Sequence, residues 1–526
     1  MTSSAILQYT IEPIAELPID THLAEALLSS LANYAEQLHG HRLWLACSGG
    51  RDSLALAALC VQLYRHGKLP FLPQLLHVNH GLQVDSGIWA KHVAKWAEAQ
   101  EIPCRILSAQ VDGHDEQAAR QARYDVMRAQ LNQDDVLLLA HHADDQAETV
   151  LMRLIQGAGV NGLSGMQPWH LQTQGRRRNI LWRPWLTVQR TSISAYAQRL
   201  KLPYIDDPTN DAGDNVRSGL RRDVMPVLAK YNPNVIDNIA RSAQLLSDAQ
   251  ATVSAQAEQD MQQTAITSLQ LPPAQRVLDI DELQKLPLYR QRQLLHCWLA
   301  QDEPLPPAKQ LVDEVLNLVE RNDNDHQTAL FWQGRTQSYS IRRYRQQLYR
   351  LSNEWLTWLN MPLDEQTQPL APANLSSNIS TGVFDDNLVS ICLRTSADFT
   401  WQLQILPQVL AQLLDNTKGE HALQTVVKPV FNIRALDRKQ RVQTALASRP
   451  QSGKKLYQTL GIPSWMRESL MVISAVCTYD EELPLLLVSP FESWVLGTDK
   501  SSTAIRNDSS ILDSAIGSVL SVNNFL

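Results

Sequence analysis

Short apolar runs alternate with amphipathic stretches through the first third of this 526-residue chain. The apolar runs lie at 43–47, 75–78, 104–107 and 136–140. Stretches with apolar residues at helical spacing follow them at 53–66, 85–100, 116–131 and 146–156. Gly67 and Gly157 stand just after two of these stretches, where helices often end. Strands separated by helices are typical of a parallel sheet, so we predict an α/β nucleotide-binding domain.

The pattern changes after Gly157, and we expect no further strands of this sheet there. Residues 214–263 read as helical, and a smaller helical segment follows at 286–320. Residues 328–351 alternate as a β-hairpin and carry arginines without any acidic residue. These are Arg335, Arg342, Arg343, Arg345 and Arg350. The hairpin is therefore predicted to be a basic strip.

These changes of pattern divide the chain into five predicted parts. They are a parallel-sheet α/β catalytic domain at 1–225, a helical domain with the basic hairpin at 226–355, a linker at 356–388, a small mixed α/β C-terminal domain at 389–500 and a tail at 501–526. The linker is predicted because Pro, Asn, Ser and Thr are frequent there.

Composition is that of an ordinary globular protein, with 44% hydrophobic and 19% charged residues. No apolar run approaches the ~18 residues of a membrane span, and residues 1–20 lack the basic residues of a secretory signal. We therefore expect a cytoplasmic protein without a membrane partner. A net charge of -7 argues against wholesale coating of nucleic acid but leaves room for local basic surfaces.

A glycine-containing loop follows the first predicted strand and reads Ser48, Gly49, Gly50, Arg51, Asp52, Ser53. The glycines let the backbone approach a ligand, and the following helix offers unpaired N–H groups to an anion. The carboxylate of Asp52 can face phosphate only across a divalent cation, so we predict Mg²⁺ there. A capped tight turn is the structural alternative. No G-x-x-x-x-G-K-[ST] phosphate loop is present.

Polar residues also follow the second and fourth predicted strands, where ligands of open α/β sheets collect. They are Asn79, His80, His141, Asp144 and Asp145. The two carboxylates begin a helix, so one can cap it while the other helps to hold Mg²⁺ or the substrate. The histidines lack the helical spacing of a zinc motif, and we expect no structural zinc. His77 is expected to be a core residue.

Two arginine pairs lie at helical spacing. Arg120 and Arg123 are three residues apart and can neutralise charge on a transferring phosphoryl group. Arg217 and Arg221 are four apart and form one positive face suited to an anionic substrate. Solvated surface charges are the alternative for both pairs.

The loop S-G-G-x-D-S after a first strand resembles the PP-loop ATP pyrophosphatases, which cleave ATP between the α and β phosphates. Segments 77–86, 116–124 and 140–149 resemble the tRNA(Ile)-lysidine synthetases in order and spacing, and so do 206–226 and 454–467. Ser218 stands where the family usually has Asn, and Gln83 where it often has Arg. The resemblance spans about 43–495 and is strong up to 226.

This resemblance implies a ligase that forms a carbon–nitrogen bond. It would use ATP and Mg²⁺ to adenylate O2 of the wobble cytidine in a CAU-anticodon tRNA(Ile), and L-lysine would then displace AMP to give lysidine. ATP would bind at 48–53 and Mg²⁺ at Asp52 and Asp145. Catalytic roles are expected for Asp52, Arg120, Arg123, Asp144 and Asp145, and substrate contacts for Asn79, His80, His141, Arg217 and Arg221.

Phosphates of the tRNA are expected to meet basic clusters beyond Gly157. The predicted contacts are Arg342, Arg343, Lys454 and Lys455, with a loop at 176–178 and Arg467 as further candidates. A solvated face is the alternative for each cluster. A homodimer is compatible with the sequence.

Three other functions are weighed against this one. A tRNA 2-thiocytidine enzyme needs a C-x-x-C pair and an iron–sulfur cluster, and the six scattered cysteines offer no such pair. A GMP synthetase-like amidotransferase needs a glutaminase cysteine or an ammonia channel. A non-catalytic tRNA-binding protein with a degenerate ATP fold would not need Asp52 or the carboxylates at 144–145.

Overall fold

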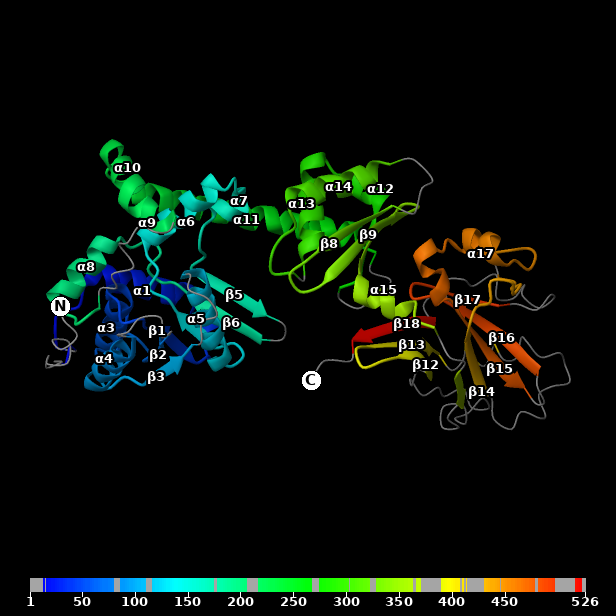
Figure 1. Ribbon diagram of the computed structural model, residues 1–526, viewed down its shortest axis with the longest axis horizontal. Coiled ribbons are helices and arrows are strands. Elements are labelled where there is room, and N and C mark those ends of the chain that lie inside the picture. Colours follow the sequence, from blue (N-terminus) through cyan, green and yellow to red (C-terminus); the bar gives the residue numbers. More distant parts are fainter. Residues whose placement is uncertain are drawn as a thin grey trace. The chain divides into compact units, whose positions relative to one another are not determined.

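The computed structural model describes most of the chain (Figure 1). The described residues are 13–14, 16–79, 86–109, 116–174, 177–205, 216–266, 274–301, 303–321, 328–362, 366–369, 389–406, 409–410, 413, 430–444, 446–477, 481–496 and 516–522. The chain forms two compact units, Met1–Ser254 and Ala255–Leu526. The division falls inside helix α11 (Val235–Thr264), later than the predicted boundary after residue 225.

A six-stranded sheet in the order β3-β2-β1-β4-β6-β5 forms the centre of unit 1. Its four predicted strands are β1 (Leu43–Ala46), β2 (Gln74–Asn79), β3 (Cys104–Ser108) and β4 (Val136–Leu138), and they pair in parallel. The predicted helices are α3 (Arg51–Arg65), α4 (Ser86–Ala99), α5 (Glu116–Gln130) and α6 (Ala143–Ile155). The predicted parallel-sheet fold is confirmed. Gly67 and Gly157 adopt φ of 66° and 75°, as expected of residues that end helices.

Alternating side chains of the strands feed two cores on opposite faces of this sheet. Leu45 packs with residues of α3 and α4, whereas its neighbour Trp44 packs with Met127 and Leu131 at the end of α5. The remaining helices of unit 1 are α1 (Thr21–Asn33), α2 (Ala35–Leu38), α7 (Val160–Leu163), α8 (Arg190–Arg199), α9 (Val216–Gly219), the π-helical turn η3 (Leu220–Val224) and α10 (Met225–Tyr231). The helical interpretation of 214–263 is confirmed for the part that the structure describes.

The expectation that strands stop after Gly157 is wrong. An antiparallel hairpin of β5 (Trp169–Gln174) and β6 (Arg177–Trp182) extends the sheet, and β6 pairs in parallel with β4. The predicted basic loop at 176–178 is therefore a strand at 177–178, while Arg176 lies outside the described residues. The Arg178 side chain forms an ion pair with Asp134, with Nε and Oδ1 2.6 Å apart.

The first half of unit 2 holds the predicted helical segment and hairpin. Its helices are α12 (Ile280–Gln284), α13 (Leu288–Ala300), α14 (Lys309–Glu320) and α15 (Asn353–Leu359). Its strands are β7 (Arg276–Asp279), β8 (Ala329–Gln333), β9 (Ser338–Tyr344) and β10 (Gln347–Ser352), in the order β7-β10-β9-β8. The predicted hairpin is thus part of a four-stranded sheet.

The second half of unit 2 contains two further sheets, in the orders β11-β14-β15-β16-β17 and β12-β13-β18. The strands are β11 (Gln366–Pro369), β12 (Val389–Thr395), β13 (Phe399–Ile405), β14 (Val430–Ala435), β15 (Met471–Cys477), β16 (Glu481–Val488), β17 (Ser493–Val495) and β18 (Ile516–Val522). They are joined by helix α17 (Gly453–Leu460) and a 3-10 helix, η5 (Ser464–Ser469).

Two predicted connecting segments contribute to these sheets. Strand β11 lies inside the predicted linker at 356–388 and pairs with β14, and α15 ends only at Leu359. Strand β18 lies inside the predicted tail and pairs with β13. One hydrophobic core also joins both halves of unit 2, with Tyr349 and Trp355 packed in the same cluster as Trp401 and Ile433. Within the described residues, no helix is long and apolar enough to cross a membrane.

Candidate active site

The loop between β1 and α3 is held in shape by its own serines. Ser53 Oγ accepts a hydrogen bond from the Ser48 backbone at 3.2 Å and donates one to Gly50 O at 3.0 Å. Gly49 adopts φ of 85°, and a Cβ there would lie 2.9 Å from Val93 Cγ2. The loop therefore needs glycine at this position for both conformation and space.

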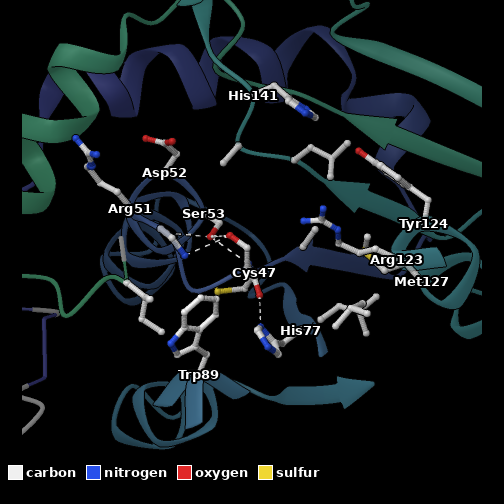
Figure 2. Close-up of a pocket in the computed structure, with 18 of the residues that line it drawn as sticks. Cys47, Arg51, Asp52, Ser53, His77, Trp89, Arg123, Tyr124, Met127 and His141 are labelled. Atoms are coloured by element: carbon white, nitrogen blue, oxygen red, sulfur yellow. Dashed lines mark hydrogen bonds between the residues drawn. The ribbon is translucent and has the colours of Figure 1, made fainter. Parts of the chain in front are cut away.

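A cavity of about 350 Å³ opens beside this loop at the carboxyl ends of β1, β2 and β4 (Figure 2). Figure 2 shows Arg51 and Asp52 on one side of the cavity and Arg123, Tyr124 and Met127 on another. The predicted site residues that line it are Ser48, Gly50, Arg51, Asp52, Ser53, Asn79, Arg123, His141 and Asp145. The volume is that of a small-molecule site.

Asp52 lies in the first turn of α3, and its two carboxylate oxygens have different surroundings. Its Oδ1 is buried without a hydrogen-bond partner among the described residues, and its Oδ2 lies 3.6 Å from His142 Nε2. A buried carboxylate oxygen without a donor suits a cation. Asp145 lines the same cavity, and Mg²⁺ needs only one or two carboxylates when phosphates and waters complete its shell. The two carboxylates therefore fit the predicted cation.

His142 lies at the centre of three carboxylates and was missed by the sequence reasoning. It precedes α6, is 2% exposed, and lies 3.4 Å from Asp145 and 3.5 Å from Asp144 through its ring nitrogens. Burial lowers the pKa of His142, but Asp144, Asp52 and Asp145 outweigh it and raise the pKa to about 10. The three carboxylates therefore favour the protonated form of His142.

Arg217 and Arg221 do not line the cavity but are held by a buried glutamate that the sequence reasoning also missed. Glu148 is 2% exposed and accepts from Arg217 Nε at 2.6 Å and from Arg221 Nε at 2.7 Å. Arg217 Nη2 also donates to Asp145 Oδ1 at 2.9 Å. The arginines thus join α9 and η3 to α6 and reach the cavity only through Asp145.

The other predicted site residues have different outcomes. Asp144 does not line the cavity; its Oδ2 accepts from the Arg190 backbone at 2.8 Å and ties α8 to α6. Arg120 lies in α5, but its side chain is outside the described part of the chain, as is His80. His77 is buried with Nδ1 2.8 Å from Cys47 O, which confirms its expected place in the core.

The arginines of the basic hairpin in unit 2 make more contacts within the protein than the sequence indicated. Arg350 is fully buried with its guanidinium 3.8 Å from the Tyr339 ring centroid, so its expected place on a basic surface strip is wrong. Arg342 is half-buried over Trp465, and Arg343 donates to carbonyls of α14. Lys454 and Lys455, in the first turn of α17, are exposed.

Two parts of the chain match models of known protein families. Residues 21–228 match the model of the PP-loop domain, and residues 278–349 match that of the TilS substrate binding domain. The chain is therefore a PP-loop protein that uses ATP.

Proteins similar over most of the chain show to which family of PP-loop proteins it belongs. The tRNA(Ile)-lysidine synthase of Psychrobacter sp. is 40% identical over 471 residues, which cover 86% of this chain and 88% of the relative. That of Pseudomonas aeruginosa is 36% identical over 63% of this chain and 73% of its own. The chain belongs to the tRNA(Ile)-lysidine synthase family, whose members are carbon–nitrogen ligases, and the expected family and enzyme class are confirmed.

The U34-tRNA thiolase NcsA from Methanococcus maripaludis matches 46% of this chain and 89% of its own at 18% identity, with a TM-score of 0.33. A likeness at this level supports no conclusion about function.

Proposed function

We propose that this chain adenylates O2 of the wobble cytidine in a CAU-anticodon tRNA(Ile) and then joins that base to L-lysine. The proposal rests mainly on one cavity, which is lined by the serine–glycine loop, by Asp52 with its donor-free Oδ1 and by Arg123. The likeness of the chain to tRNA(Ile)-lysidine synthases over most of its length supports the choice of substrate.

In the first step, cytidine O2 attacks the α-phosphorus of ATP and pyrophosphate leaves. The loop at 48–53 binds the leaving pyrophosphate through backbone N–H groups and serine hydroxyls. Mg²⁺ held by Asp52 and Asp145 would neutralise phosphate charge. Arg123 faces the same cavity from α5 and is placed to stabilise the transferring phosphoryl group.

In the second step, the lysine ε-amine attacks C2 of the adenylated base and AMP leaves, so the amine must lose a proton. Asp52 and Asp145 are the carboxylates among the described cavity residues. Burial raises the pKa of Asp145, but His142 and Arg217 outweigh it and keep this pKa below its usual value. Asp145 therefore stays ionised, which suits its assigned place beside Mg²⁺.

Binding of tRNA is assigned to unit 2, where exposed Lys454 and Lys455 offer phosphate contacts. The matched substrate binding domain at 278–349 supports this assignment. Because a tRNA-modifying enzyme must meet tRNA, we propose the cytoplasm as the compartment.

The test replaces Asp52 by Asn and measures pyrophosphate release, followed by mass analysis of the cytidine after reaction with lysine. Wild type should release pyrophosphate only with both ATP and the CAU-anticodon tRNA, and Asp52→Asn should lose at least about two orders of magnitude in rate. Asp134→Asn is the matched control, because Asp134 pairs with Arg178 and does not line the cavity. Full activity of Asp52→Asn would contradict the assigned site. Tight tRNA binding without pyrophosphate release by wild type would favour a binding protein.

A further inference from the structure

Arginines of the β9–β10 hairpin are used to bind the ends of helices. Arg343 Nη1 donates to Leu318 O at 3.3 Å and to Val319 O at 3.2 Å, near the end of α14. Arg345, in the turn after β9, donates from Nη2 to Gln458 O near the end of α17. The last carbonyls of a helix lack partners within it and attract cations. Charges that looked like a phosphate-binding strip thus hold two helices to one hairpin.

The end of α17 is shaped to receive Arg345. Gly461 follows the helix with φ of 72°, and Ile462 N donates to Tyr457 O at 2.9 Å. A Cβ at Gly461 would lie 2.7 Å from Arg345 Nη1. Glycine adopts this left-handed backbone without strain, and a side chain there would displace the guanidinium from its present position.

Trp465, four residues after Gly461, also contacts the β9–β10 hairpin. The Arg342 guanidinium lies 5.1 Å from its ring centroid, and the rings of Tyr344 and Tyr349 meet it edge-on at 6.2 and 5.7 Å. Asn360 Nδ2 also donates to Trp465 O at 3.3 Å. Cation–π and aromatic contacts of this kind favour one relative placement of the two segments.

Helix α17 carries its lysines at the opposite end from Arg345. Lys454 and Lys455 stand in the first turn, where the helix dipole disfavours cations, and neither has an ion-pair partner within the described residues. Two exposed cations that weaken their own helix are suited to an external anion. Their position relative to the hairpin is set by the contacts at the other end of the helix.

We propose that Arg342, Arg345, Gly461 and Trp465 form a joint, here called the hairpin joint, that fixes the lysines of α17 against the β9–β10 hairpin for binding tRNA phosphates. The joint residues are positioning residues: they act through Lys454 and Lys455 and do not touch the nucleic acid. This inference rests on the proposed function in that it takes tRNA as the substrate.

The primary variant is Arg345→Gly, because Arg345 is exposed and has φ of 52°, which glycine adopts without strain. We expect KM for tRNA to rise roughly two- to fivefold, the range of a helix-end charge contact, with kcat and KM for ATP unchanged. Gly461→Ala removes no charge yet disturbs the same contact, and it should raise KM for tRNA as well. Direct phosphate binding by Arg345 also predicts a rise in KM for tRNA in Gly461→Ala, because a Cβ there displaces the guanidinium, so a double-mutant cycle is needed to separate the two roles.

A double-mutant cycle distinguishes a positioning role of Arg345 from direct phosphate binding by Arg345. In a Lys454→Ala, Lys455→Ala background, Arg345→Gly should have no further effect on tRNA binding measured by fluorescence anisotropy. An effect of Arg345→Gly that persists in this background, or an unchanged KM for tRNA in both Arg345→Gly and Gly461→Ala, overturns the joint. Because anisotropy requires no turnover, a wild type that binds tRNA but does not release pyrophosphate contradicts the proposed function and leaves the cycle measurable.

Discussion

Replacing Glu148 by Gln should loosen the packing of α9 and η3 on α6. The carboxylate accepts from Arg217 at 2.6 Å and from Arg221 at 2.7 and 3.0 Å. An amide keeps one acceptor oxygen but loses the charge and turns an NH₂ group towards a guanidinium. Breaking a buried ion pair costs about 3–5 kcal/mol. Since the arginine side chains are 27% and 30% exposed and Asp145 remains a partner, we expect about 2 kcal/mol.

Hydrogen exchange followed by mass spectrometry measures this loss locally, because amides of α6 exchange through opening of the segment. A loss of about 2 kcal/mol corresponds to roughly thirtyfold faster exchange in peptides of α6 and α9. Glu101→Gln is the matched control: Glu101 pairs with Arg65 but is 84% exposed, so its loss should cost under about 0.5 kcal/mol. Exchange in Glu148→Gln that stays within threefold of wild type, or a control that changes as much, would refute the reasoning.

Two further substitutions test other parts of the structure. Glu303 accepts from the backbone of Arg335 and Thr336 and from the Tyr339 hydroxyl, and these bonds outweigh burial and lower its pKa. The ionised carboxylate of Glu303 therefore stabilises the fold above its unfolded pKa of about 4.3, and this stabilisation is lost as pH falls through the folded pKa. We expect the melting temperatures of wild type and Glu303→Gln to converge when the pH is lowered below about 4. Gly49→Ala, with φ of 85° and a 2.9 Å contact to Val93, should weaken ATP binding roughly tenfold in a binding titration; unchanged affinity would contradict the assigned loop.

The first four strands and their helices could be predicted because each is encoded locally. The run at 43–47 is apolar enough to be buried on both faces, and the glycines after it mark the loop. The hairpin of β5 and β6 could not be found in this way. Strand β5 is polar because it lies at the edge of the sheet. In β6, buried Asn179 donates to Asn132 O, a partner distant in the chain.

Site residues that belong to a sequence motif could be predicted, whereas residues that pair only in the folded chain could not. Asp52 and Asp145 follow strands, so topology places them at one edge. Glu148 looks like a surface residue of α6, and it is buried only because α9 brings Arg217 against it. Arg342 and Arg343 likewise looked like solvent-facing charges, since nothing local in the sequence indicates a helix end or a tryptophan as their partner.

Strand β18 gives the C-terminal sheet an unusual order of assembly. Phe399 pairs with Val522 and Ile405 with Ile516, so β13 acquires this neighbour long after β13 itself has been made. During synthesis on the ribosome, the apolar side chains and the unpaired backbone edge of β13 are open to other chains until residues 516–522 emerge. Expression from templates that end before β18 should therefore give aggregation even though the ATP site lies in unit 1.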